Sequence, residues 1–267
     1  MYHSLIFVDP TTNKKINTYD DWFLAPSERP VVAPAVLKDK YLEIPGASLS
    51  IDMSEALTGY PTYKNREGSF TLIVLNDLDN PSEPVKSWTY RLNQMTEFLH
   101  GKQLKMFLED ERDYFYFGRF QVEDWNTPSS GFRSEVKIKY NLEPYKWTLQ
   151  LTNEPWLWDP FNFETGSVNE TGSKFNLDVN SPNSFTEYTF GDDGFETRVP
   201  TVPVFRVSDV SVTMQVRFVN EHLGIDVTHT LAEGDNELLD CIITNNTWKF
   251  YVKGTGKIAI VYRKGRI

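Results

Sequence analysis

Only one stretch of this chain, residues 87–100, has the apolar periodicity of an amphipathic helix. Its apolar stripe repeats at helical spacing and consists of Trp88, Leu92, Met95 and Leu99. Ser87 is a suitable N-cap, and Gly101 stands where a left-handed C-terminal residue is favoured. The remaining apolar runs are short and strand-like. The sequence therefore predicts a mainly β protein whose N-terminal domain is α+β, a β-sheet or sandwich with one helix and a long hairpin.

The strand-like runs of the first half lie between polar turns. They span residues 5–8, 48–53, 69–75, 104–108, 114–122 and 136–140. The acidic turn at 110–113 predicts the tip of a hairpin. Residues 48–53 alternate polar and apolar side chains, which predicts a half-buried strand.

Prolines at positions 26, 30, 34 and 45 exclude a helix between residues 23 and 46 and favour extended chain. We expect this segment to lie against the body of the domain through apolar anchors. These are Val31, Val32, Val36, Leu37 and Leu42.

The composition changes after Trp147. Residues 153–160 form a polar and aromatic joint with two prolines, which predicts two domains, 1–147 and 148–267. In the second, short apolar runs alternate with Gly, Asn and Asp turns, a pattern typical of a β-sandwich. The predicted strands are 202–207, 210–219, 225–231, 238–243, 247–252 and 257–262.

The charge of the chain argues against nucleic acid as a partner. The net charge is -10, with -4 in residues 1–147 and -6 in residues 148–267, and phosphate binding depends on clustered Lys and Arg. The acidic side chains are densest at 154–196, where nine carboxylates accompany Lys174 alone, and we expect solvated loop there. No run approaches the ~20 apolar residues of a membrane span, and no signal peptide is evident, so a soluble protein is expected.

The sequence has no recognisable catalytic or metal-binding motif. The histidines at 3, 100, 222 and 229 lack the spacing of metal ligands, and Cys241 is the single cysteine. His100 can serve as a ligand or base, or interact with the negative end of the helix. We expect no enzyme activity, no metal and no cofactor.

Two groups of residues are candidates for binding. Trp156 and Trp158 recur at period 2, and their rings either stack on saccharide or partner surfaces or pack at the domain joint. The turn-rich segment 57–70 interleaves tyrosines with Lys, Asn and Arg, which favours a protein–protein contact; alternatively its tyrosines pack on the following strand. The candidate contact residues are Thr58, Gly59, Tyr60, Tyr63, Asn65 and Arg66.

Four ordered motifs suggest a family. They are the segment 57–70, the His100-Gly101 end of the helix, the acidic tip followed by an aromatic strand ending in Gly118-Arg119, and Pro144-Tyr145-Lys146. Across residues 1–147 this pattern resembles the distal tail proteins (Dit, the siphovirus tail component family).

The resemblance implies a structural hub at the tail tip or baseplate of a long-tailed phage, assembled in the host bacterial cytoplasm. Six copies would form a ring between the tail tube protein and the gp27-like tail-associated lysin. Residues 148–267 would be a galectin-like or carbohydrate-binding-module-like β-sandwich that carries receptor-binding components or contacts cell-surface saccharide. Two alternatives remain open: a free-standing carbohydrate-binding adhesion module and a glycan hydrolase, which would need paired carboxylates in a cleft.

Overall fold

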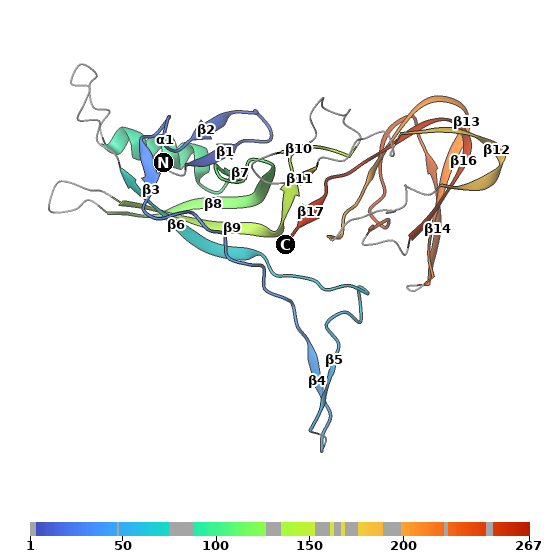
Figure 1. Cartoon of the computed structure of the whole chain (residues 1–267), viewed down its shortest axis with the longest axis horizontal. Coiled ribbons are helices and arrows are strands. Elements are labelled where there is room, and N and C mark those ends of the chain that lie inside the picture. The colour runs from blue at the N-terminus through green and yellow to red at the C-terminus, as the bar shows by residue number, and fades with distance from the viewer. Residues whose placement is uncertain are drawn as a thin grey trace. The chain divides into compact units, whose positions relative to one another are not determined.

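The computed structural model describes residues 4–46, 48–74, 88–126, 135–152, 161–162, 167–168, 176–188, 199–221, 224–243 and 248–267. The chain divides into two compact units, residues 1–147 with Ile267, and residues 148–266. One helix and many strands confirm the prediction of a mainly β fold (Figure 1). Within the described residues, no helix has the length and apolarity that a membrane crossing requires.

An antiparallel sheet forms the body of the first unit. Its strands follow the order β2-β1-β7-β8-β9-β6-β3. Their bounds are β1 Leu5–Val8, β2 Lys15–Asn17, β3 Leu24–Pro26, β6 Arg66–Val74, β7 Gln103–Leu108, β8 Tyr114–Asn126 and β9 Glu135–Thr148. The predicted hairpin tip at 110–113 joins β7 and β8.

The alternation of side chains along β9 shows how this sheet makes its core. Val136, Ile138, Tyr140 and Leu142 are buried, whereas the residues between them are exposed. Because successive strand residues point to opposite faces, one face of β9 is apolar and the other polar. Phe70 of β6 lies opposite Ile138, and its ring is 4.7 Å from that of Tyr140.

The predicted helix is α1 (Trp88–Leu99), and it covers the apolar face of the sheet. Met95 and Leu99 are fully buried as the stripe requires, and Phe98 packs edge-on against Trp22 at 6.0 Å. Gly101 has φ 74°, the left-handed conformation expected after the helix. Ser87 lies outside the described residues.

Two expectations for residues 31–53 are wrong. Of the five expected anchors only Val32 is buried, and Val31, Val36, Leu37 and Leu42 are exposed. Residues 50–52 do form strand β5 (Ser50–Asp52), but all three are exposed rather than half-buried. The reason is that β5 pairs only with β4 (Tyr41–Glu43), and this two-stranded hairpin has no sheet beneath it among the described residues.

The second unit contains a five-stranded sheet and a two-stranded sheet. The larger sheet has the order β12-β16-β13-β14, and β15 also pairs with β13. The bounds are β10 Phe161–Asn162, β11 Ser167–Val168, β12 Asn176–Tyr188, β13 Val204–Asn220, β14 Ile225–Leu231, β15 Gly234–Glu237 and β16 Trp248–Val261. The short strand β17 (Gly265–Arg266) belongs to neither of these sheets and pairs with β9.

A bend in β13 and β16 folds the larger sheet over on itself. Phe205 and Phe218 are 13 positions apart on β13, which would separate them by roughly 43 Å on a straight strand, yet their ring centroids are 5.4 Å apart. The β13–β16 register shifts between Ser208 and Gln215, at the bend. Two layers of the core therefore come from one bent sheet, as the orange arch in Figure 1 shows.

Three details of the second unit differ from prediction. The four runs 202–207, 210–219, 247–252 and 257–262 merge pairwise into β13 and β16, because the breaks between them are bends within paired strands. Residues 238–243 are a loop following β15 rather than a strand. The acidic stretch 154–196, expected to be loop, contains β12, where pairing with β16 overrides the polar composition. The joint at 153–160 lies outside the described residues.

Candidate functional site

A two-stranded arm, residues 36–64, extends beyond the sheet of the first unit (Figure 1). Its stem is held by backbone hydrogen bonds from Lys38 N to Thr62 O and from Lys64 N to Val36 O, both 2.8 Å. Its outer part is the β4–β5 pair, in which Leu42 lies opposite Ile51. Gly46 at the tip has φ 83°, which permits the tight reversal there.

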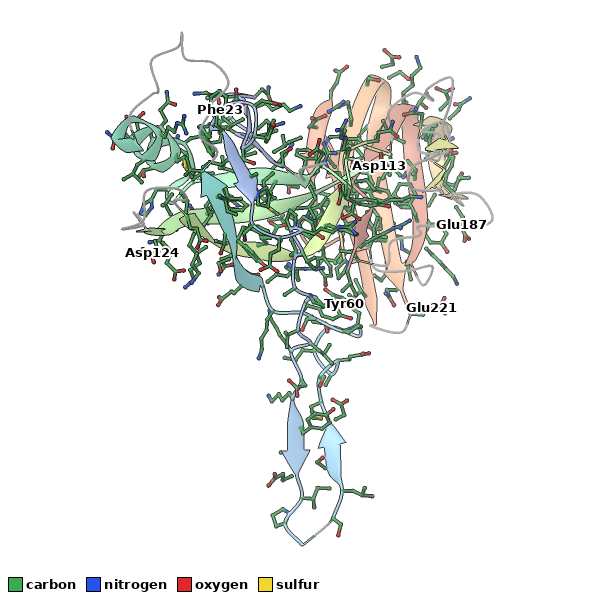
Figure 2. All side chains as sticks on the ribbon, turned by 60° about the vertical axis from the view of Figure 1, so that its left-hand side comes forward. Phe23, Tyr60, Asp113, Asp124, Glu187 and Glu221 are labelled. Carbon is green, nitrogen blue, oxygen red and sulfur yellow. The ribbon has the colours of Figure 1, made fainter. Side chains whose placement is uncertain are left out.

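Exposed apolar side chains are concentrated in and next to the arm. Of the 16 large hydrophobic side chains exposed among the described residues, ten lie between positions 31 and 57. In the outer hairpin and in the segment that leads back from it, the exposed apolar side chains are Tyr41, Leu42, Ile44, Leu49, Ile51, Met53 and Leu57. Leu57 is 95% exposed. Figure 2 shows side chains standing out from both strands of the arm. Contiguous exposed apolar side chains are typical of interaction sites, so the arm is the candidate site.

A cluster of tyrosines holds the base of the arm. The half-buried ring of Tyr63 packs edge-on against Tyr145 of β9 at 6.0 Å. Tyr60, labelled in Figure 2 where the arm meets the body, is also half-buried. Burial raises the pKa of Tyr60, and burial together with the neighbouring tyrosines raises the pKa of Tyr145 to about 12. The predicted contact tyrosines thus form part of the joint between arm and sheet.

Arg66, the first residue of β6, is buried at the same joint and hydrogen-bonds to two other segments of the chain. Its side chain is 5% exposed, and it donates from Nε to Pro144 O at 2.8 Å and from Nη1 to Ala33 O at 3.1 Å. Burial lowers the pKa of the guanidinium, which also lies 5.6 Å from the ring of Tyr116. Arg66 therefore connects the chain entering the arm to β9 through a buried side chain.

The other predicted contact residues line the returning strand. Thr58 Oγ1 donates to Tyr60 O at 2.6 Å, and Gly59, with φ 72°, is exposed in the turn before the stem. Asn65 is exposed and donates from Nδ2 to Asn141 Oδ1 at 2.8 Å. The six predicted residues thus run along the returning leg of the arm to the start of β6, with Gly59 and Asn65 the most accessible.

Residues of the ordered sequence motifs contact one another in the folded first unit. Arg119 Nη1 donates to Gly101 O at 2.6 Å, which joins the end of α1 to β8. A Cβ at Gly118 would collide with the backbone of β9, so glycine permits the close approach of these strands. Lys146 forms an ion pair with Glu111 in the β7–β8 turn. The motif residues therefore build the frame from which the arm extends.

Sequence reasoning missed the outer part of the arm. The available signal was the pair of apolar-rich runs 41–44 and 48–53 on either side of Pro45-Gly46, which indicates a hairpin. The apolar content of these runs favoured burial instead. Trp156 and Trp158, the predicted saccharide or partner surface, lie outside the described residues.

Comparison with known proteins finds a likeness of fold. No protein-family model and no curated protein matches the chain. Among solved structures, it is similar to the Dit (gp 19.1) protein of phage SPP1, described as a paradigm of the hub adsorption apparatus in phages that infect Gram-positive bacteria. The TM-score is 0.52 at 12% identity, and the match covers 100% of both chains. The chain therefore has a Dit-like fold over its whole length.

Proposed function

We propose that this protein is the structural hub of a long-tailed phage tail tip or baseplate, with no catalytic role. The observation that carries this proposal is the full-length likeness of fold to a protein of a phage hub adsorption apparatus. The exposed arm supports an assembly role independently of that likeness, because it offers contact surface rather than a cavity. Residues 1–147 are then the hub domain, located in the virion.

In this proposal, the arm packs against a second copy of the same chain. Permanent homomeric interfaces are more apolar than transient ones, and the arm carries most of the exposed apolar side chains of the described residues. A two-stranded hairpin is marginal in water unless its side chains are covered. Burying each such side chain contributes about 1.5–3 kcal/mol.

A closed ring forms when the arm of each copy packs against the next copy and each copy is contacted by the arm of the copy before it. Such head-to-tail contacts need two different patches per copy and close when the rotation between copies allows it. We propose six copies, with the tail tube protein on one face of the ring and the gp27-like tail-associated lysin on the other. The segment 58–66 orients the arm by holding its base.

The second unit, residues 148–267, carries peripheral adhesion components or contacts cell-surface saccharide in this proposal. Trp156 and Trp158 are the proposed contact residues, since aromatic rings stack on sugars and anchor protein contacts. Trp156→Ala with Trp158→Ala should abolish binding to a phage receptor-binding protein or to host polysaccharide. If the double variant bound the same ligand as tightly as the wild type does, Trp156 and Trp158 would not be the contact residues.

The decisive experiment measures mass in solution for the full chain, alone and mixed with tail tube and tail-lysin proteins. We expect a hexamer for the wild type. The variant Leu42→Ser with Ile51→Ser removes a cross-strand pair of exposed side chains and should lower association by about 100-fold or more, because two apolar burials are lost at each contact.

The matched control is Leu239→Ser in the second unit, where the side chain is 72% exposed and lies far from the arm in sequence. This variant should assemble as the wild type does. Thermal unfolding of all three proteins separates lost assembly from lost folding. A wild type that stays monomeric with both partners present would refute the ring, and normal assembly of the arm variant would refute the arm contact.

A further inference from the structure

Three potential metal ligands converge in the second unit. His229 lies on β14, and Asp240 and Cys241 lie in the loop that follows β15. Their ligating atoms all fall within 4.8 Å of one another. His229 Nε2 is 2.8 Å from Asp240 Oδ2, and Cys241 Sγ is 3.9 Å from Asp240 Oδ1.

The three ligands differ in their exposure to solvent. The Cys241 side chain is buried, with the residue 1% exposed. The side chains of His229 and Asp240 are 29% and 50% exposed. A bound ion would therefore contact one buried sulfur and two more accessible ligand atoms, a nitrogen and an oxygen.

The backbone positions the two halves of this cluster. His229 pairs in register with Val216, which fixes its place on β14, the terminal strand of the sheet order. The loop is anchored by a hydrogen bond from Cys241 N to Leu238 O at 3.0 Å and by reciprocal backbone bonds between Ile243 and Thr201. The spacing of the ligands is thus set by the fold and not by flexible side chains alone.

We propose that His229, Asp240 and Cys241 bind a zinc-class divalent cation. Thiolate, imidazole and carboxylate are the three ligand types that Zn²⁺ takes in proteins, at about 2.0–2.3 Å in tetrahedral geometry. Those bond lengths place ligand atoms roughly 3.3–3.8 Å apart. The cluster reaches this geometry when the half-buried His229 and the exposed Asp240 side chains separate and Asp240 moves closer to Cys241, and water completes the fourth position.

The ligand set selects among cations. Ca²⁺ and Mg²⁺ require six or more oxygen ligands, which this cluster does not supply. A sulfur ligand favours softer ions such as Zn²⁺ and Co²⁺.

Occupancy of the site would fasten the loop 238–243 to a terminal strand. β14 has a paired neighbour in the described sheet only on its β13 side. An ion bonded to His229 and to two loop residues cross-links segments that are otherwise joined at this point by the His229–Asp240 contact. Because an ion that binds only the folded state stabilises it, the second unit should unfold at higher temperature with metal.

The competing explanation is an ordinary histidine–aspartate pair above a buried thiol. To distinguish the two, tag-free full-length protein is stripped with EDTA and titrated with Co²⁺ and then Zn²⁺. The proposal expects one ion per chain, a thiolate-to-cobalt charge-transfer band, displacement of Co²⁺ by Zn²⁺, and a rise of several degrees in the unfolding midpoint of the second unit.

Variants test the assignment of ligands. Cys241→Ser should remove the charge-transfer band, and Asp240→Asn should weaken Zn²⁺ binding by about tenfold or more, the loss that even residues outside the ligand set can cause. His100→Ala, a change at an exposed histidine of the first unit, should bind as the wild type does. Absence of stoichiometric binding at millimolar metal, or a charge-transfer band that survives Cys241→Ser, would overturn the proposal. Neither result bears on the ring.

Discussion

The arm and the β13–β16 pair are both antiparallel strand pairs rich in apolar residues, but they differ in whether those residues are buried. In the β13–β16 pair the sheet bends, and Phe205 packs within 5.9 Å of both Phe218 and Phe250. In the outer part of the arm, β4 and β5 pair only with each other among the described strands, and Leu42 and Ile51 are about half exposed at 54% and 46%. A bend lets a strand pair bury its own apolar face, whereas the arm leaves these side chains exposed.

The two regions also use glycine differently. Gly254 of β16 has φ 129°, and a Cβ there would lie 2.8 Å from Met214 Cα and 2.8 Å from Thr213 O. Gly46 at the tip of the arm has φ 83°, but nothing lies within 4 Å of its would-be Cβ. At the bend, glycine provides both a backbone conformation and space, and at the tip it provides the conformation alone.

The largest effect that this comparison predicts is at Gly254. Gly254→Ala should lower the free energy of unfolding of the second unit by about 3 kcal/mol or more, because backbone strain and a steric clash add. Gly46→Ala makes the same chemical change and should cost only about 1 kcal/mol, since strain acts alone. Scanning calorimetry of both variants measures the difference, and equal losses would mean that the bend is not closely packed.

A smaller effect is expected at the joint between arm and sheet. Arg66→Ala removes two hydrogen bonds from a buried cation and leaves carbonyl oxygens without a donor, which should cost about 2–4 kcal/mol of unfolding free energy in the first unit. Arg112→Ala, where the side chain is 67% exposed, should change stability by less than about 0.5 kcal/mol. Urea denaturation tests both. If Arg66→Ala were as mild as Arg112→Ala, the arm would not depend on this tie.

The smallest effect concerns alkaline pH. Burial raises the pKa of Tyr116 and of Tyr145 to about 12, compared with the usual value of 10.0. Their protons are therefore held more tightly in the folded state, so stability is complete below pH 10 and falls as the pH rises toward 12.

Denaturation at a series of pH values should show this decline for the first unit. The variant Tyr116→Phe with Tyr145→Phe should show a shallower decline between pH 10 and 12, because the two groups no longer ionise on unfolding. A decline as steep in the variant as in the wild type would mean that these rings are not the buried groups responsible.

Local patterns of the sequence were sufficient for much of the first unit. The periodicity of residues 87–100 predicted α1, and the strand-like run 136–140 predicted a strand that the structure shows as part of β9. Both succeed because helix and strand periods determine which side chains share a face, and that face then packs on the core. The Pro-Gly dipeptide at the arm tip was an equally local signal, although the apolar residues around it led us to expect burial.

The sequence by itself determined that the chain is acidic and that its described part is mainly β with one helix. Only the tertiary structure decided that Arg66 ties β6 to β9, that β13 and β16 bend into two layers, and that His229, Asp240 and Cys241 meet. The physical reason is sequence separation. Periodicity and turn chemistry act over a few residues, whereas these contacts join positions 11 to 78 residues apart, and their formation depends on the register and bend of whole strands.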